Sequence, residues 1–408
     1  MDLVDIERDG LRAVADTQPA ATVPELRVAL FTGNYNYIRD GVALTLNRLV
    51  GYLQRQNVPV LVIAPTGPSP AFEPTGEMVS VPSVPIPLRS EYRIALGLPR
   101  HARARLEQFR PTLFHIAVPD ILGYRALKLA QEWNVPVVSS YHTRYDTYLK
   151  YYGLSVLENY GKRYLRDFYA QCRQIYPPSE SMAAILREDG IASDIKVWSR
   201  GVDEKLFNPG KRSLEWRRSR AVNDDDVLIT FVGRLVKEKN TDLLLRVFAS
   251  LRQRGVRFRA MIVGDGPEMP VMKAGLPDGV FTGFVHSEEL ACAYASSDIF
   301  FFPSESETFG NVTLEAMACG LPAVCADATG SRTLVIEGET GFLGNAKNEV
   351  EFVDSLERLV NSPELRGEMG RSALAHAMDY RWDSVMAGLH ANYLSVLAET
   401  ETLARHPA

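Results

Sequence analysis

The chain has 408 residues, 46% of them hydrophobic and 23% charged, with a formal net charge of -5 at pH 7. This length exceeds what one hydrophobic core holds and predicts two domains, while the negative charge argues against a general nucleic-acid binder. No apolar run reaches the roughly 18 residues of a membrane-spanning helix. The acidic start, with no secretion signal, and four cysteines without metal-ligand spacing predict a cytosolic protein.

The charge is unevenly distributed along the chain. Residues 27–200 hold 21 Lys and Arg against 14 Asp and Glu, whereas residues 201–408 hold 22 against 30. Part of the excess comes from Leu88–Arg110, where six arginines alternate with apolar and aromatic residues. Such a segment favours contact between the basic N-terminal half and an anionic membrane, although a solvated helix face has the same charges.

Alternating strands and helices fill the first half of the chain. Residues 1–25 are polar and acidic and predict an N-terminal arm. The apolar segments that follow predict the strands Leu26–Phe31, Val58–Ala64, Leu113–Val118, Val135–Tyr141 and Gln174–Tyr176. Because helical segments separate these strands, residues 26–200 predict one α/β domain with a parallel, doubly wound sheet.

The same alternation restarts after a hinge, which we place at residues 201–212. The predicted second domain, residues 213–378, has the strands Val227–Gly233, Phe258–Val263, Val280–Val285, Ile299–Phe302 and Pro322–Ala326. Residues 379–408 predict a terminal helix that crosses back to the first domain. Two Rossmann-like domains of this kind place the ligand in the cleft between them.

Two acidic residues eight positions apart mark the most informative segment, SESETFGNVTLEAMACGLP at 304–322. Glu307 lies on a predicted strand-to-helix loop, and Glu315 lies one turn inside the helix Asn311–Cys319, on the face of Asn311. The free amides at this helix start favour a phosphate or a sugar hydroxyl. They belong to Phe309, Gly310, Asn311 and Val312.

Two cations follow the first strand of the second domain, in GRLVKEKN at 233–240. Arg234 and Lys239 lie there at the mouth of the sheet, where a fork-shaped guanidinium and an ammonium suit a diphosphate. A solvated helix start is the alternative. Gly264 begins the turn GDGP, which could let a nucleobase lie on the backbone but lacks the GxGxxG dinucleotide pattern.

The first half contributes two loops to the predicted cleft. His142 follows a strand in SYHTRYD, and the polar and aromatic neighbours Arg144, Tyr145 and Tyr148 favour binding of a polar ligand, although a lone histidine is more often structural. Gly41 ends the first loop, where glycine allows a phosphate to approach the backbone; an ordinary turn is the alternative.

Together these motifs resemble the retaining glycosyltransferases of family 4, which have the GT-B fold, over nearly the whole chain beyond residue 26. Glu307 and Glu315 match the E-x7-E signature, GRLVKEKN the phosphate motif, and Gly201-Val-Asp203 with Phe207-x-Pro209 the hinge motif. SYHTRYDTYLKYY and the basic segment before it are similar to the branch with sulfoquinovosyl-diacylglycerol synthase-like enzymes and GDP-mannose-dependent mannosyltransferases. The resemblance implies two Rossmann-like domains facing a central cleft.

The resemblance also implies roles for individual residues. Arg234 and Lys239 would neutralise the nucleotide diphosphate, Glu307 would hold sugar hydroxyls, Glu315 the ribose, and His142 the sugar near the reacting carbon. The remaining donor contacts would come from Gly41, Gly233, Gly264, Val285 and the amides of residues 309–312. Arg144, Tyr145 and Tyr148 would lie on the acceptor side.

From this we expect a retaining, metal-independent hexosyltransferase without a cofactor, cytoplasmic and peripheral on the inner face of the membrane. Its donor would be a nucleotide sugar, UDP-linked in preference to GDP-linked, and its acceptor a membrane lipid. We expect no nucleic-acid partner. The alternatives are a GDP-mannose-dependent mannosyltransferase acting on a glycan or glycolipid, and a non-catalytic protein that binds sugar nucleotides.

Overall fold

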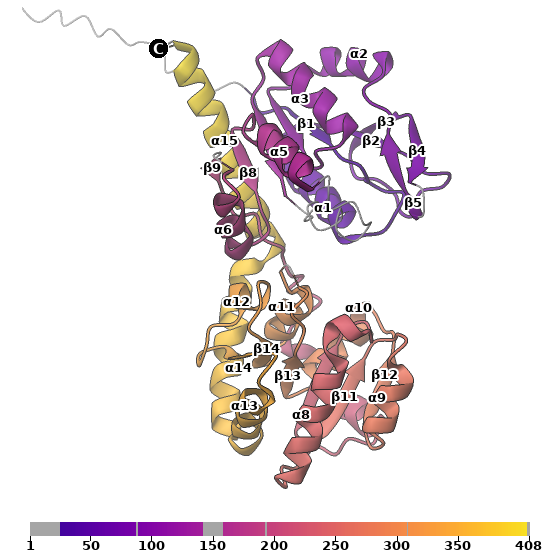
Figure 1. The fold of residues 1–408 in the computed structure, drawn as a ribbon, viewed down its shortest axis with the longest axis vertical. Helices are drawn as coiled ribbons and strands as arrows, with labels where there is room; N and C mark the ends of the chain where they lie inside the picture. The colour runs from indigo at the N-terminus through magenta and orange to yellow at the C-terminus, as the bar shows by residue number, and fades with distance from the viewer. Residues whose placement is uncertain (1–24, 87–88, 142–157, 192–193, 308, 406–408) are drawn as a thin grey trace, which may run out of the picture.

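The structure is a computed structural model that describes residues 25–86, 89–141, 158–191, 194–307 and 309–405. It has two α/β domains, each built on a parallel sheet, and a long C-terminal helix that lies along the N-terminal domain (Figure 1). The fold class predicted from the sequence is therefore confirmed. The expected N-terminal arm lies outside the described residues, apart from Glu25.

The N-terminal sheet has seven strands in the order β3-β2-β1-β6-β7-β8-β9, all parallel. Their bounds are β1 Val28–Phe31, β2 Val60–Pro65, β3 Glu77–Val81, β6 Leu113–Ile116, β7 Val137–Ser140, β8 Gln174–Tyr176 and β9 Asp194–Ile195. The central strands β1, β2, β6, β7 and β8 are buried along their whole length, as expected for a sheet covered on both faces. An antiparallel pair, β4 Ser83–Ile86 and β5 Arg89–Ala95, lies outside this sheet.

The helices of this domain are α1 Gly41–Arg55, α2 Arg100–Phe109, α3 Ile121–Trp133, α5 Glu158–Tyr169 and α6 Glu180–Glu188. Helix α1 begins where the Asp40 carboxylate accepts a hydrogen bond of 2.8 Å from the Ala43 amide. Its buried residues Leu46, Leu49, Val50 and Leu53 recur at helical spacing and pack on one face of the sheet.

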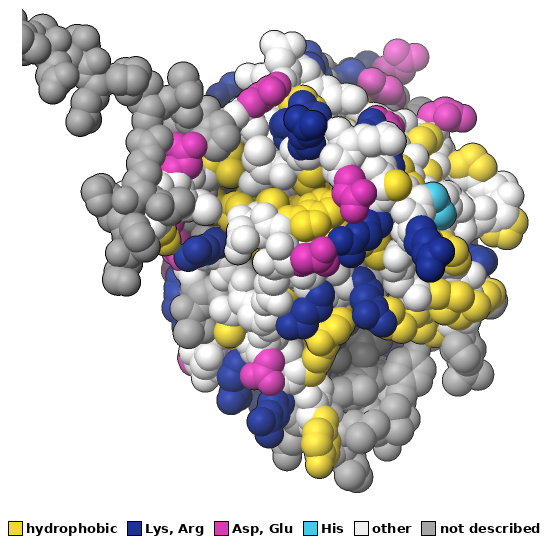
Figure 2. Space-filling view, turned by 90° about the horizontal axis from the view of Figure 1, so that it is seen from above, with side chains coloured by type: hydrophobic (Ala, Val, Ile, Leu, Met, Phe, Trp, Pro, Cys, Tyr) yellow, Lys and Arg dark blue, Asp and Glu magenta, His cyan; other side chains and the backbone are white. Residues whose placement is uncertain are grey.

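The arginine-rich segment differs from the membrane-facing helix that its sequence suggested. The apolar residues of α2, Ala102, Leu106 and Phe109, are buried in the domain core. Arg103 forms an ion pair with Glu132 at 2.5 Å, and Arg105 is paired in the same way with Glu77 at 2.7 Å. Figure 2 shows Lys and Arg side chains interspersed with Asp and Glu on the end of the N-terminal domain that faces away from the C-terminal domain. Helix α2 therefore has no free apolar face for a membrane.

The C-terminal sheet has six parallel strands in the order β12-β11-β10-β13-β14-β15. They are β10 Leu228–Val232, β11 Arg259–Val263, β12 Val280–Gly283, β13 Ile299–Phe302, β14 Ala323–Ala326 and β15 Gly341–Gly344. The helices are α7 Leu214–Ser219, α8 Thr241–Gln253, α9 Met269–Gly275, α10 Ser287–Ala295, α11 Asn311–Ala318, α12 Ser331–Leu334, α13 Glu349–Asn361 and α14 Pro363–Ala377. Short 3-10 turns lie at Pro209–Lys211, Lys237–Lys239 and Met378–Tyr380.

The last helix, α15 Trp382–Arg405, packs on the N-terminal sheet although it follows the C-terminal domain in the chain. Its residues Met386, Leu389 and Tyr393 are buried in the same cluster as α1 and β1. The Tyr393 hydroxyl is hydrogen-bonded to Nδ1 of His115, a fully buried residue of β6 whose pKa is lowered to about 3 by burial. A neutral imidazole thus helps to hold α15 on the N-terminal domain.

Candidate functional site

The candidate site lies at the carboxyl ends of β10 and β13, where the strand order of the C-terminal sheet reverses. Lys239 follows β10 and Glu307 follows β13, and the two side chains form an ion pair. The Lys239 ammonium also donates to Ser306 Oγ at 2.9 Å. Parallel sheets bind ligands at such a point because the loops on either side diverge and leave a crevice. The structure therefore brings together two of the predicted site residues from the loops that follow two neighbouring strands.

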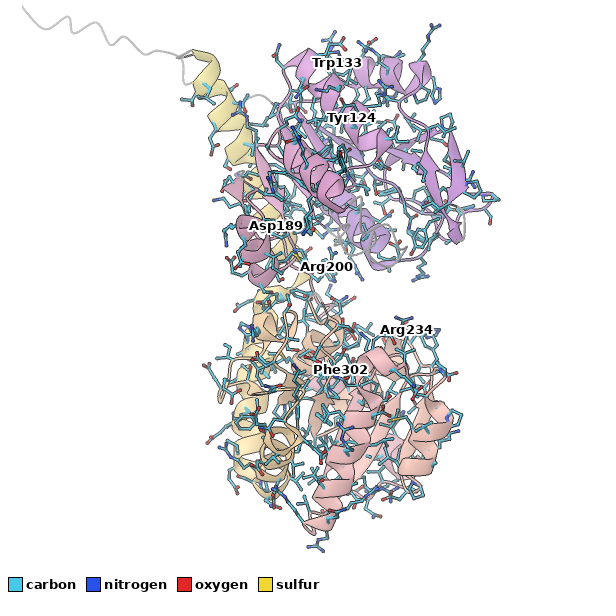
Figure 3. The ribbon with its side chains drawn as sticks, in the orientation of Figure 1. Tyr124, Trp133, Asp189, Arg200, Arg234 and Phe302 are labelled. Carbon is cyan, nitrogen blue, oxygen red and sulfur yellow. The ribbon has the colours of Figure 1, made fainter. Side chains whose placement is uncertain are left out.

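Arg234 lies in the same β10 loop but does not join this pair. Its side chain is exposed and lies on the end of the C-terminal domain that faces the N-terminal domain (Figure 3). Among the residues that the structure describes, no ion pair involves Arg234. The loop beneath it is fixed by the Leu235 amide, which donates to the Asp265 carbonyl at 2.9 Å. Arg234 thus presents toward the N-terminal domain a guanidinium that has no ion-pair partner among the described residues.

The predicted donor-side glycines let neighbouring loops pack backbone against backbone. A Cβ on Gly264 would lie 1.9 Å from the Gly233 carbonyl oxygen, and Gly264 has φ of +134°, so another residue would be strained there. The Gly264 amide donates to the Gly283 carbonyl at the end of β12. Val285, in the loop after β12, is half-buried. This packing explains Gly264 without a ligand, and a donor contact there stays a prediction.

Helix α11 begins next to Glu307 with an open N-terminus. Gly310 is its N-cap with φ of +96°, and no side chain among the described residues caps it. The first amides that bond back, those of Thr313 and Leu314, both reach the Gly310 carbonyl, which leaves the amides of Asn311 and Val312 outside the helix ladder. Phe309 is buried against Tyr380, with ring centroids 5.9 Å apart. This helix start can accept an anion or a hydroxyl oxygen.

Glu315 lies one turn inside α11 and is half-buried. Burial raises the pKa of its carboxyl to about 7, and a hydrogen bond of 3.2 Å from the Tyr294 hydroxyl and the charge of Arg48 oppose this rise. Arg48 belongs to α1 of the N-terminal domain, so the second acid of the E-x7-E pair is influenced from across the domain boundary. No motif in the sequence marks either Tyr294 or Arg48 as a site residue.

On the N-terminal side, Gly41 is the first residue of α1 and is exposed. A Cβ added there would meet no heavy atom within 4 Å. Asp40, the N-cap, also accepts a hydrogen bond of 2.9 Å from the Asn34 side chain, which fixes the loop before the helix. Arg200, which sequence reasoning also missed, lies at the junction of the domains (Figure 3). Burial lowers the pKa of its guanidinium to about 10, and the charge of Asp40 opposes this shift. The start of α1 thus leaves open space beside a positive group.

Several predicted residues lie outside the described part of the chain. They are His142, Arg144, Tyr145 and Tyr148, all in the segment 142–157 that follows β7. Within the described residues, no cluster of three or more His, Cys, Asp and Glu side chains is arranged to bind a metal ion. No described helix combines the length and the apolar character that crossing a membrane requires.

Comparison with known proteins agrees with this geometry. Residues 39–206 match the family described as Glycosyltransferase Family 4, and residues 213–376 match Glycosyl transferases group 1. The chain is 32% identical to a GDP-mannose-dependent alpha-mannosyltransferase of Corynebacterium glutamicum, over 93% of this chain and 91% of that protein. The chain belongs to the family 4, group 1 glycosyltransferases. As a member of this family it uses nucleotide-sugar donors.

Two further relatives of this glycosyltransferase differ in what their names say they make. It is 32% identical to the sulfoquinovosyl transferase SQD2 of Arabidopsis thaliana, over 87% of this chain and 71% of that one. It is 25% identical to an alpha-monoglucosyldiacylglycerol synthase of Streptococcus pneumoniae, over 83% of this chain and 80% of that protein. Sucrose-phosphate synthase from Thermosynechococcus elongatus shares its fold, with a TM-score of 0.72 at 18% identity over 92% of this chain and all of that chain. The fold is therefore shared by proteins whose names describe different activities.

Proposed function

We propose that this glycosyltransferase moves a hexosyl or hexuronosyl group from a nucleotide sugar to a membrane lipid, with retention of anomeric configuration. The donor that we favour is a UDP-linked sugar. One observation carries the proposal: the Lys239–Glu307 pair lies beside the open start of α11, at the point where the strand order reverses. A cation, a carboxylate and free backbone amides there match the three needs of a sugar diphosphate. These are charge neutralisation, hydroxyl binding and phosphate binding.

The leaving group sets the chemistry of the transfer. Breaking the anomeric bond builds positive charge on the sugar ring and negative charge on the departing phosphate. Arg234, Lys239 and the α11 N-terminus stabilise the phosphate where its charge develops. The acceptor hydroxyl attacks from the same face, and the departing phosphate takes its proton. Because the cations and the helix start supply the charge, the reaction needs neither a metal ion nor a carboxylate nucleophile.

Glu307 and Lys239 neutralise each other in the unliganded chain. A bound diphosphate competes for the Lys239 ammonium, and Glu307 is then free to accept hydrogen bonds from sugar hydroxyls. Glu315 binds the ribose, Gly41 admits the diphosphate from the N-terminal side, and His142 contacts the sugar near the reacting carbon. Donor binding in this scheme exchanges the Lys239–Glu307 ion pair for one between Lys239 and the diphosphate, and sugar hydroxyls then donate to the Glu307 carboxylate.

A lipid acceptor is supported by the relative named alpha-monoglucosyldiacylglycerol synthase. The N-terminal half, which would bind the acceptor, is also the basic half of the chain. Anionic lipid surfaces attract such a domain, and we place the enzyme as a peripheral protein on the inner face of the membrane.

A GDP-mannose donor is the second candidate, because the C. glutamicum relative is named for it and aligns over nearly the whole chain. Calorimetric titration with UDP and with GDP separates the two donors. The preferred nucleotide should bind at least about tenfold more tightly, a difference of about 1.4 kcal/mol. Tighter binding of GDP would overturn the UDP form of the proposal.

The transfer itself is tested with a panel of UDP- and GDP-linked sugars on a total lipid extract, read by mass spectrometry. The proposal expects one lipid class to gain one hexose mass. Tight nucleotide binding without hydrolysis or transfer on any lipid or glycan would instead support a non-catalytic sugar-nucleotide-binding protein.

A further inference from the structure

Helices α3 and α5 of the N-terminal domain lie side by side and are joined by hydrogen bonds near the two ends of α3. The Tyr164 hydroxyl of α5 donates to the Pro119 carbonyl, just before α3, at 2.9 Å. At the other end, the Gln131 side chain of α3 donates to the Gln171 side chain just after α5, at 2.5 Å. In Figure 1 both helices lie on the same side of the N-terminal sheet. Their outward side chains therefore form one surface.

This surface exposes apolar and aromatic side chains that the fold does not bury. Ile121 is 49% exposed, Tyr124 40% and Tyr160 75%. Leu96, 59% exposed, joins the same surface, because a Cβ on the adjacent Gly97 would lie 3.8 Å from the Arg125 side chain of α3. Single exposed apolar side chains are common on protein surfaces, whereas neighbouring ones mark interaction sites. These side chains therefore indicate an interaction surface.

Cations surround these apolar groups. Arg125, Lys128, Arg163 and Arg166 are all exposed on α3 and α5. Lys128 lies 5.7 Å from the centre of the Tyr124 ring, and the one ion pair found among these four cations is the weak contact of 3.9 Å between Arg163 and Asp167. This count covers only the part of the chain that the structure describes. Arg103 and Arg105 of α2, by contrast, are held by carboxylates at 2.5–2.7 Å.

The surface borders the mouth of the N-terminal sheet. Tyr164 is bonded to Pro119, and the next residue, Asp120, has its carboxylate 3.6 Å from where a Cβ on Gly33 would lie. Gly33 follows β1 and Asp120 follows β6, and the N-terminal strand order reverses between these two strands. A lipid held at the α3–α5 surface would therefore have its headgroup beside the crevice that faces the donor site.

We propose that the surface formed by Leu96, α3 and α5 is where this enzyme rests on an anionic bilayer. The inference depends on the proposed lipid acceptor. Tyrosines prefer the headgroup level of a membrane, exposed Ile and Leu side chains insert below it, and exposed Lys and Arg are attracted to anionic lipid. The occupant is thus a bilayer, chosen over a second protein because four exposed cations lie on α3 and α5 and, among the described residues, only Arg163 has an ion-pair partner.

The test compares sedimentation with phosphatidylcholine vesicles and with vesicles that also contain phosphatidylglycerol. The full chain should bind the anionic vesicles, and high salt should weaken that binding. The combined variant Ile121→Ser, Tyr160→Ser and Arg163→Glu should bind them at least about tenfold more weakly. The control carries Val350→Ser and Arg257→Glu, which alter an exposed valine of α13 and an exposed arginine of the C-terminal domain, and should bind like the unchanged chain.

Nucleotide binding by calorimetry and the size of the protein in solution accompany each measurement. Unchanged nucleotide binding with lost vesicle binding supports the proposed surface. Equal vesicle binding by the variant and the control overturns the proposal. A variant that changes its oligomeric state but keeps its vesicle binding overturns it as well. If the surface binds vesicles but no lipid is ever glycosylated, the lipid acceptor fails while the membrane surface stands.

Discussion

Gly41 offers a test in which stability and activity should change in opposite directions. It is the first residue of α1, and a Cβ added there meets no heavy atom within 4 Å. Gly41→Ala should therefore cause no clash and should stabilise the chain by about 0.4–1 kcal/mol, because alanine loses less backbone entropy on folding. For a domain of this size the midpoint of thermal unfolding should rise by roughly 2 °C.

The same methyl group should oppose catalysis if a diphosphate lies against the start of α1. It fills space that the ligand would occupy, and displacement of the donor by about 1 Å costs on the order of 10²-fold in rate. The assay is release of the nucleotide diphosphate from the preferred donor, together with calorimetric binding of that nucleotide. Gly388→Ala is the matched control, since Gly388 of α15 is also exposed with no heavy atom within 4 Å of its Cβ position. This control should gain stability and keep its activity.

A Gly41→Ala enzyme with raised stability and unchanged transfer would show that the donor does not approach α1. A Gly41→Ala enzyme that unfolds more easily would contradict the open space that the structure shows. Only stabilisation combined with weaker binding and slower transfer agrees with the proposed site.

Three further changes probe the C-terminal side of the site. Lys239→Ala should slow transfer by about 10²–10³-fold and should lower the free energy of unfolding by about 1–2 kcal/mol. The control, Lys237→Ala, changes an exposed neighbour and should leave the kinetics unchanged. Equal kinetics in the two variants would remove Lys239 from the mechanism. Because the pKa of the Glu315 carboxyl is raised to about 7, donor affinity measured by calorimetric titration should increase as pH rises from 6 to 8. Glu315→Gln should abolish this pH dependence. If donor affinity still changes with pH in Glu315→Gln, the dependence belongs to another group. The free energy of unfolding of the unliganded chain should change with pH in the opposite direction to donor affinity. The contribution of the raised Glu315 pKa to stability is fully present below pH 4.5 and is lost as pH rises through about 7. Gly330→Ala would place a Cβ 2.9 Å from the Glu307 carbonyl oxygen and would therefore displace the backbone of Glu307. Transfer should slow by on the order of 10²-fold. Unchanged kinetics would show that the Glu307 backbone can move without effect on transfer.

Local signals in the sequence predicted most of the elements and the loops that carry the site. The E-x7-E spacing placed Glu307 on a loop and Glu315 inside a helix, and both lie there in the structure. Such predictions succeed because caps, glycines and apolar periodicity act within a few residues. The predicted strand Val280–Val285 ends earlier, at Gly283, whose φ of +69° breaks the extended backbone.

Contacts between distant segments could not be predicted in this way. Lys239 meets Glu307 because β10 and β13 are neighbours in the sheet, an order that no local pattern specifies. The influence of Arg48 on Glu315 depends on how two domains meet. Strand β15, Gly341–Gly344, was missed because only two apolar residues lie between its glycines. The roles of His142, Arg144, Tyr145 and Tyr148 stay predictions, because these residues are outside the described part of the chain.

The arrangement of the two domains bears directly on Glu307. The Ser181 hydroxyl of α6 donates to the Thr329 carbonyl at 2.9 Å, which joins the N-terminal domain to the segment before α12. The next residue, Gly330, donates its amide to the Glu307 carbonyl at 3.0 Å. Any rotation that separates α6 from this segment breaks the first bond and removes one support of the loop that carries Glu307. The Glu307 loop therefore has this support only while α6 and the segment before α12 stay in contact, and a hinge rotation of the domains would remove it.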